Sequence, residues 1–150
     1  MRLALFQPDQ AGNVGAVLRL AACFGVPLDI IEPCGFAFSD RALKRAGMDY
    51  AEMAAVTRHA GWAAFEARLP ARLVLFTTAG DVPLPEVRLE PGDTLLFGSE
   101  SRGAPEAVHR RADLRVRIPQ VEGTRSLNLA VAAGIGVAEA LRQIDWWPGA

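Results

Sequence analysis

Hydrophobic residues along the chain follow two different spacings. Some form short continuous runs with the length and aliphatic composition of buried β-strands. Such runs lie at residues 2–6, 28–31, 53–58, 72–77, 94–97 and 114–118. Between them, apolar residues recur every three or four positions, as on one face of a helix, most clearly over residues 13–24. Strands that alternate with helices predict an α/β fold with a largely parallel sheet.

Polar residues and glycines mark where the predicted helices begin and end. Asn13 is expected to cap the first helix and Gly25 to end it. A short helix is expected to begin after Ser39, and the terminal helix to begin at Ser126. Residues 81–91 hold three prolines and three acidic residues, a composition that predicts an extended connector on the surface.

Composition then narrows the class of protein. The chain has 150 residues, of which 51% are hydrophobic, enough for the core of one domain over residues 1–150. Lys and Arg number 16 against 17 Asp and Glu, which excludes a strongly basic polycation. No apolar run approaches the roughly 20 residues that span a bilayer, and the apolar start is too short for a secretory signal. Cys23 and Cys34 match no metal or redox spacing. We therefore expect a cytoplasmic protein without a membrane span or a metal.

Basic side chains are nevertheless clustered. Arg41, Lys44 and Arg45 form one cluster, Arg58 begins a second, and residues 110–117 hold a third. Solvated surfaces would explain each cluster taken alone. If the clusters converge in space or across a dimer, they would instead bind a polyanion.

The first of three polar loops covers residues 8–15. Gly12 and Gly15 precede the first helix, and Glu32 follows the second strand, as in a dinucleotide-binding fold. The G-x-G-x-x-G fingerprint is absent, so a plain turn explains the two glycines better. Arg19 is a lone cation in an otherwise apolar helix, and both a surface position and a polyanion contact would account for it.

Two further loops place polar side chains after predicted strands. Residues 98–103 hold Glu100 and Arg102 between two glycines, either as a surface ion pair in a turn or as a loop that a ligand approaches closely. Ser126 and Asn128 open the terminal helix, where unpaired N–H groups favour a polar ligand. Open α/β sheets bind ligands at the carboxyl ends of their strands, so we expect the three loops to form one site.

Together, the three loops resemble the signature motifs of the SPOUT superfamily of methyltransferases, in particular its 2′-O-ribose branch. The motifs stand here at residues 13–19, 97–103 and 118–128. Within the family, the chain looks most like the members that methylate the wobble nucleotide of tRNA. The stretches that carry this closer likeness are residues 30–33, 45–50 and 56–59.

The resemblance implies a parallel α/β sheet flanked by helices, with a deep trefoil knot in its C-terminal part. S-adenosylmethionine (SAM) would bind in that knot, held mainly by backbone groups. The family forms homodimers through the first and last helices. Carried over by position, the SAM-binding residues would be Phe76, Gly98, Ile118 and Ser126.

The implied reaction is methyl transfer from SAM to the ribose 2′-hydroxyl of nucleotide 34, in the anticodon loop of tRNA, with leucine tRNA as the expected substrate. Arg19 of the partner subunit would fix a phosphate and polarise the hydroxyl, since a guanidinium does not readily deprotonate. Glu100 would orient Arg19 or Asn13, and Asn128 would support the same loop. The candidate RNA-binding residues are Arg41, Lys44, Arg45 and Arg58.

Two other interpretations stay open. The same chemistry could act on another RNA such as ribosomal RNA, although the length leaves no room for the additional RNA-binding domain of many relatives. A dimeric RNA-binding protein without catalysis is the second alternative, which the presence of Asn13, Arg19 and Glu100 disfavours. Retention of SAM separates the two enzymes from the inactive protein.

Overall fold

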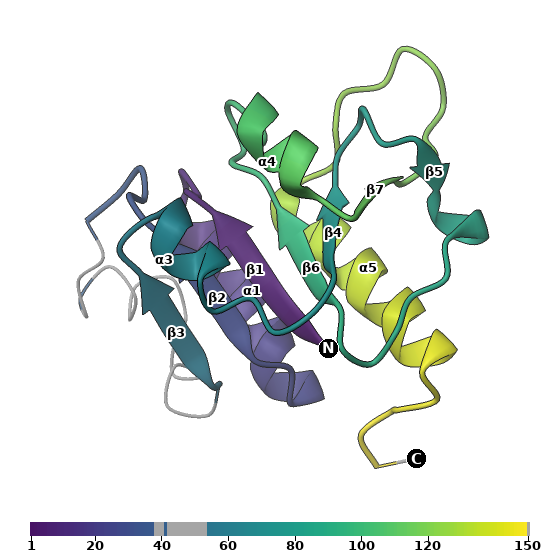
Figure 1. Cartoon of the computed structure of the whole chain (residues 1–150), viewed down its shortest axis with the longest axis horizontal. Coiled ribbons are helices and arrows are strands. Elements are labelled where there is room, and N and C mark those ends of the chain that lie inside the picture. Colours follow the sequence, from purple (N-terminus) through teal and green to yellow (C-terminus); the bar gives the residue numbers. More distant parts are fainter. Residues whose placement is uncertain (38–40, 42–53, 150) are drawn as a thin grey trace.

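The computed structural model describes residues 1–37, 41 and 54–149, and its centre is a parallel sheet (Figure 1). In the described part of the chain, seven strands lie in the order β3-β2-β1-β6-β4-β7-β5, and every neighbouring pair is parallel. The strands are β1 (Arg2–Phe6), β2 (Leu28–Ile31), β3 (Val56–His59), β4 (Leu73–Phe76), β5 (Val82–Pro83), β6 (Thr94–Phe97) and β7 (Leu114–Arg117). Because all strands run the same way, their carboxyl ends share one edge.

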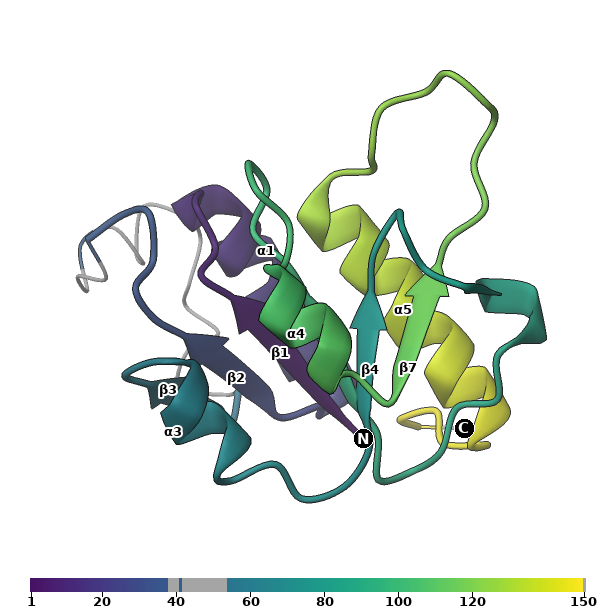
Figure 2. The same cartoon turned by 45° about the horizontal axis from the view of Figure 1, so that its top comes forward.

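Helices cover both faces of the sheet (Figures 1 and 2). They are α1 (Ala11–Phe24), α3 (Trp62–Glu66), α4 (Glu106–Arg111) and α5 (Leu129–Gln143), with a 3-10 turn, η1 (Leu84–Glu86). In β1, Leu3 and Leu5 pack under α1 and α5, whereas Ala4 and Phe6 pack under α3 and α4. This alternation buries both faces of the strand, which is why its sequence is continuously apolar.

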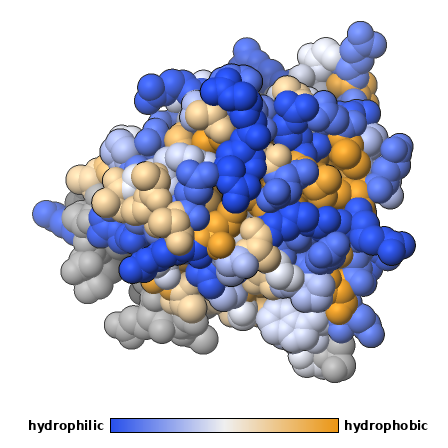
Figure 3. All heavy atoms as spheres, in the orientation of Figure 1, coloured by the Kyte–Doolittle hydropathy of each residue, from blue (hydrophilic) through white to orange (hydrophobic). Residues whose placement is uncertain are grey.

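Figure 3 shows the side that carries α3 and α4, where hydrophilic side chains interrupt the apolar ones throughout. None of the described helices is long and apolar enough to cross a membrane.

The predicted α/β class is confirmed, and so are the positions of five predicted strands. The strand expected at residues 53–58 is β3 at Val56–His59, shifted towards the C-terminus. Two predicted helix starts are wrong. α1 begins at Ala11 with Gln10 as its N-cap, and Asn13 lies buried inside the helix. α5 begins three residues after Ser126, and its N-cap is Asn128. The Asn13 side chain bonds to Glu100 and Asn128 and so does not cap α1. In α5, the side chain of Asn128 accepts from the backbone nitrogens of Ala130 and Val131 and caps the helix in place of Ser126. The helix expected after Ser39 lies outside the described residues.

Residues 81–91 are not the surface connector that their prolines and acids predict. They contain β5 and η1, and Leu84, Val87 and Leu89 are buried. The side chain of Gln143 in α5 holds this segment: its Oε1 accepts from Leu89 N at 2.8 Å, and its Nε2 donates to Val87 O at 3.0 Å. Apolar side chains therefore anchor a segment that looks polar in composition.

The backbone crosses itself closely beside β7. This strand lies between β4 and β5, so the connection from β4 to β5 passes over the end of β7. A Cβ on Gly80 would lie 2.5 Å from the backbone nitrogen of Arg117, a separation that only glycine avoids. Arg117 Nη1 donates to the carbonyl oxygens of Gly80 and Asp81, at 3.1 and 3.0 Å. The crossing is thus closely packed and hydrogen-bonded.

Candidate functional site

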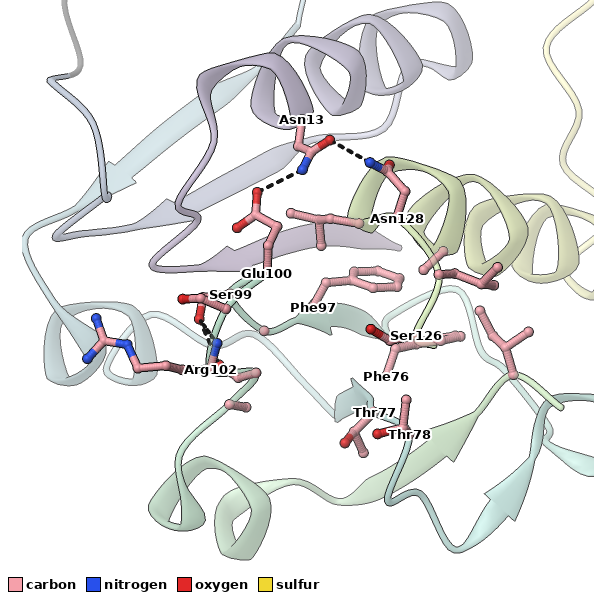
Figure 4. Close-up of a pocket in the computed structure, with 18 of the residues that line it drawn as sticks. Asn13, Phe76, Thr77, Thr78, Phe97, Ser99, Glu100, Arg102, Ser126 and Asn128 are labelled. Atoms are coloured by element: carbon pink, nitrogen blue, oxygen red, sulfur yellow. Dashed lines mark hydrogen bonds between the residues drawn. The ribbon is translucent and has the colours of Figure 1, made fainter. Parts of the chain in front are cut away.

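A cavity of about 590 Å³ lies at the carboxyl ends of β4, β6 and β7 (Figure 4). The β1–α1 loop, the β6–α4 loop and the segment before α5 complete its walls. The four residues predicted to bind a cofactor all line it: Phe76, Gly98, Ile118 and Ser126. The structure therefore brings together the three loops that the sequence singled out.

Two stacked rings form an apolar wall of this cavity. The centroids of Phe76 and Phe97 lie 4.8 Å apart, with 23° between the ring planes. Gly136 of α5 packs directly behind them, and a Cβ there would lie 3.0 Å from Phe76 Cζ. The wall is therefore fixed by close packing, and faces polar loops on the opposite side, as in sites for ligands that are part apolar and part charged.

The β6–α4 loop folds back on itself at the edge of the cavity. Ser99 and Gly103 exchange backbone hydrogen bonds of 3.0 and 2.8 Å. Gly98 comes directly before this turn and packs against its far end, where a Cβ would lie 2.5 Å from Ala104 N. The backbone at Gly98 thus lines the cavity without any side chain.

A chain of three polar side chains links the loops across the cavity (Figure 4). Asn13 Nδ2 donates to Glu100 Oε1 at 3.0 Å, and Asn128 Nδ2 donates to Asn13 Oδ1 at 2.9 Å. Asn128 Oδ1 in turn accepts from the backbone nitrogens of Ala130 and Val131, which caps α5. One network therefore ties α1, the β6–α4 loop and the start of α5 together.

Asp9 is a functional candidate that sequence reasoning missed. Its Oδ2 accepts from Ser101 N at 2.9 Å and from Ser101 Oγ at 2.5 Å. In return, Glu100 Oε2 accepts from Asp9 N at 2.6 Å, and Glu100 Oε1 accepts from Gln10 N at 3.2 Å. We call this exchange of hydrogen bonds between the two loops the carboxylate clamp. In the sequence, Asp9 was marked only as an acidic residue in a loop that follows a strand.

The clamp depends on an ionised Asp9. Hydrogen bonds from Ser101 lower the pKa of Asp9 below its ordinary value of 3.8. A depressed pKa means that the clamp stabilises the fold above about pH 4, and that this contribution is lost as the pH falls through the lower pKa of the folded protein.

Asp9→Asn is therefore expected to lower the melting temperature at pH 7 by a few degrees, because the two hydrogen bonds from Ser101 lose their ionised acceptor. The difference in the free energy of unfolding between Asp9→Asn and the unmodified protein should shrink as the pH falls below the ordinary pKa of Asp9. Urea midpoints measured at neutral and acidic pH test this, with exposed Glu86→Gln as the control. A gap that persists unchanged in acid would contradict the role of the ionised clamp.

Among the described residues, Arg19 and the basic side chains of the three clusters do not line this cavity. Arg19 is exposed on α1 and is absent from the cavity lining. Arg58 forms an ion pair with Glu32, and Arg41 is exposed, whereas Lys44 and Arg45 lie outside the described residues. In the third cluster, the ion-pair partners are acidic residues: Glu106 for Arg110, Glu66 and Asp113 for Arg111, and Asp81 for Arg115.

Glu100 and Arg102 do not form the surface ion pair that their spacing allowed. Glu100 points to Asn13, and Arg102 points away from it (Figure 4). Within residues 1–37, 41 and 54–149, no group of three or more His, Cys, Asp or Glu residues could hold a metal ion.

Comparison with known proteins gives consistent matches over nearly the whole chain. Residues 1–138 match the SpoU rRNA Methylase family. A tRNA (cytidine(34)-2′-O)-methyltransferase of Beijerinckia indica is 51% identical over 145 residues, which cover 95% of this chain and 91% of the relative.

Two solved structures extend this likeness to the fold. One, on the 2-OH methylation of C/U34 on tRNA, aligns with a TM-score of 0.90 at 46% identity and covers 95% of this chain and 94% of its own. An AdoMet-bound rRNA methyltransferase from Sinorhizobium meliloti aligns with a TM-score of 0.82 at 29% identity, over 94% of this chain and 55% of its own.

Proposed function

The chain belongs to the SpoU rRNA Methylase family, and from this membership and the geometry of its site we propose that it transfers a methyl group from SAM to the ribose 2′-hydroxyl of nucleotide 34 in tRNA. The observation that carries the proposal is the cavity at the carboxyl ends of β4, β6 and β7, spanned by the Glu100–Asn13–Asn128 network. Relatives that share this chain over nearly its full length have the same activity in their names.

The residues of the cavity fit SAM. The volume of about 590 Å³ lies in the range of pockets for ligands of this size. The Phe76–Phe97 wall suits the adenine ring, and the turn at Gly98 leaves its backbone exposed to a ligand. Phe76, Gly98, Ile118 and Ser126 would hold the cofactor. When bound, SAM supplies an electrophilic methyl group on a sulfonium centre.

Glu100 acts as a positioning residue. Both of its carboxylate oxygens are occupied, by the backbone nitrogens of Asp9 and Gln10 and by the side chain of Asn13. A carboxylate held by three donors is poorly placed to take the proton of the ribose hydroxyl. It instead fixes Asn13 at the edge of the cavity, where precise placement of the reacting groups accounts for much of the rate.

Arg19 would act from the partner subunit of a homodimer. It is exposed on α1 and does not line its own cavity. The helices expected at the interface carry exposed apolar side chains: Val131 on α5 is 50% exposed, and Trp146 and Trp147 after α5 are 48% and 41% exposed. The Trp147 ring packs against Phe24 of α1 with the centroids 5.7 Å apart, so the exposed tryptophans lie where the ends of both helices meet, and Val131 lies at the other end of α5.

The C-terminal part would be knotted. β7 lies between β4 and β5, and the β4–β5 connection crosses over its end in backbone contact at Gly80. The chain after β7 passes beyond this connection to form part of the cavity and then α5. This arrangement supports the trefoil knot that the resemblance implies, with residues 1–150 forming one catalytic domain.

The tRNA anticodon loop is the proposed partner, with leucine tRNA as the first substrate to test and the cytoplasm, where tRNA functions, as the location. Arg41, Lys44, Arg45 and Arg58 remain candidates for its phosphates. Arg58 lies beside Glu32, so this pair would have to open for Arg58 to contact RNA.

The experiment is transfer of a labelled methyl group from SAM to leucine tRNA, followed by nuclease mapping of the product. Label at the 2′-oxygen of nucleotide 34 is the expected result. The matched control is the same tRNA with a 2′-O-methyl group already at nucleotide 34, which should accept no label. SAM binding without transfer to tRNA would move the proposal to another RNA, and failure to bind SAM would overturn it.

A further inference from the structure

A row of polar side chains crosses the α3 side of the sheet near the amino ends of the strands. Thr57 of β3 pairs in register with Asp29 of β2, and Arg2 of β1 pairs with Thr94 of β6. These four strands are adjacent. The remaining core on this face is apolar, so the polar row is an exception that the methyl-transfer site does not use.

The row lines a second cavity of about 250 Å³, far above the roughly 30 Å³ that one water molecule occupies in the liquid. Arg2 and Thr94 are the first residues of β1 and β6, whereas Phe97 at the methyl-transfer site is the last residue of β6. Three residues of strand span about 10 Å, so the two cavities are separate. The lining residues are Arg2, Asp29, Thr57, His59, Phe65, Arg68, Pro70 and Thr94.

The one carboxylate in this cavity is already engaged. Asp29 Oδ2 accepts from Arg2 Nε at 2.8 Å, and Asp29 Oδ1 lies 2.7 Å from His59 Nε2. The side chains of Asp29 and His59 are almost completely buried. Asp29 is therefore held by Arg2 and His59, and the groups left to donate to a ligand are the guanidinium N–H groups and the threonine hydroxyls.

Three such donors lack a partner in the described part of the chain. Thr94 Oγ1 is fully buried and makes no hydrogen bond. Arg68, just after α3, has an exposed side chain for which no described residue provides an ion pair. The Nη groups of Arg2 likewise donate to no described residue, since only its Nε reaches Asp29. A buried polar group without a partner, such as the Thr94 hydroxyl, is rare in folded proteins and calls for an explanation, and the two more exposed arginines beside it can donate to a ligand.

We propose that this cavity binds a phosphate monoester. Two guanidinium groups face one carboxylate, which leaves the cavity positively charged, and guanidinium groups match the oxygens of a phosphate in a bidentate manner. Thr94 lies at the buried end of the cavity, within reach of a terminal phosphate. A phosphodiester, which continues on both sides, would require an open groove. The source is either a free mononucleotide or the 5′-phosphate end of an RNA.

Calorimetric titration of the full chain with AMP and inorganic phosphate tests the proposal, with adenosine as the ligand control. AMP and phosphate should bind, and adenosine should not. Arg68→Gln should weaken AMP binding at least tenfold. Arg88→Gln, which neutralises another exposed arginine outside the cavity, should bind AMP as the unmodified protein does.

Thr94→Val gives a second, independent readout. Because it removes a buried hydroxyl that has no partner, it should raise the melting temperature of the ligand-free protein by about 2–4 °C. It should also abolish the further rise that AMP causes. A lower melting temperature for ligand-free Thr94→Val would overturn the proposal, because it would show that the hydroxyl is already satisfied.

Two short RNAs that differ only in a 5′-phosphate or a 5′-hydroxyl separate the two sources. Tighter binding of the phosphorylated RNA than of both AMP and the 5′-hydroxyl RNA identifies an RNA end, whereas equal binding of the two RNAs identifies a free mononucleotide. No binding of any phosphate, or binding that Arg68→Gln leaves unchanged, overturns the site. Methyl transfer is not measured, so failure here leaves the proposed methyltransferase function standing.

Discussion

Arg19→Ala is expected to lower kcat for methyl transfer to tRNA by about 10³-fold, while the Kd for SAM stays within about twofold. The guanidinium would contact the reacting ribose and its phosphate, but Arg19 does not line the cofactor cavity of its own chain. Single-turnover transfer of labelled methyl and calorimetry with SAM measure the two quantities. Arg19→Lys should also be impaired, because a planar fork cannot be replaced by a point charge.

Mixing two inactive variants tests whether Arg19 acts across the dimer. In a heterodimer of Arg19→Ala and Gly98→Ala chains, one site combines an intact cavity with an intact Arg19 from the partner. Half of the randomly assembled dimers are heterodimers, and each has one intact site of two. The mixture should therefore show about a quarter of the activity of the unmodified protein at the same total concentration. Arg88→Ala, at an exposed arginine outside the cavity, is the matched control and should retain activity. If no activity returns, Arg19 either serves the cavity of its own chain or takes no part in the reaction.

Gly98→Ala is expected to weaken SAM binding by at least about 100-fold, because the turn that lines the cavity must open. A Cβ at this position would lie 2.5 Å from Ala104 N, and backbone cannot move aside as a side chain can. The hydrogen bonds between Ser99 and Gly103 would be lost with the turn.

Gly61→Ala is the matched control for Gly98→Ala. A Cβ on Gly61 would meet nothing within 4 Å, so SAM affinity should not change. Calorimetry with SAM, together with the melting temperature of each variant, separates loss of the site from loss of the fold. Near-normal SAM affinity in Gly98→Ala would show that the cofactor binds elsewhere.

The sequence predicts the strands well because their burial is complete. β1, β2 and β6 have the expected residues, since strands covered on both faces consist almost entirely of apolar side chains. Helix starts are predicted less well, because the deciding contacts come from elsewhere in the chain. Asn13 has the chemistry of an N-cap, but Glu100 and Asn128 engage its side chain instead. The prediction of a surface connector at residues 81–91 is wrong because Leu84, Val87 and Leu89 are buried although the segment is polar in composition.

The loops of the candidate site could be identified from the sequence, but their contacts could not. Asp9 and Ser101 are 92 positions apart, and they meet because β1 and β6 are neighbours in the sheet. Local patterns carry no information about strand order. For the same reason, nothing in the sequence indicated that Arg2, Asp29 and Thr94 line one cavity.

A ribosome releases β4, β5 and β6 before β7, although β7 belongs between β4 and β5. The nascent sheet must therefore leave a gap until the C-terminal segment has emerged, and late, non-local pairing of this kind folds slowly. Ile118, Ser126 and Asn128 join the cavity only in that last stage. A prematurely terminated chain would thus lack part of the cavity and bind no cofactor. Such a chain would be inactive, not partly active.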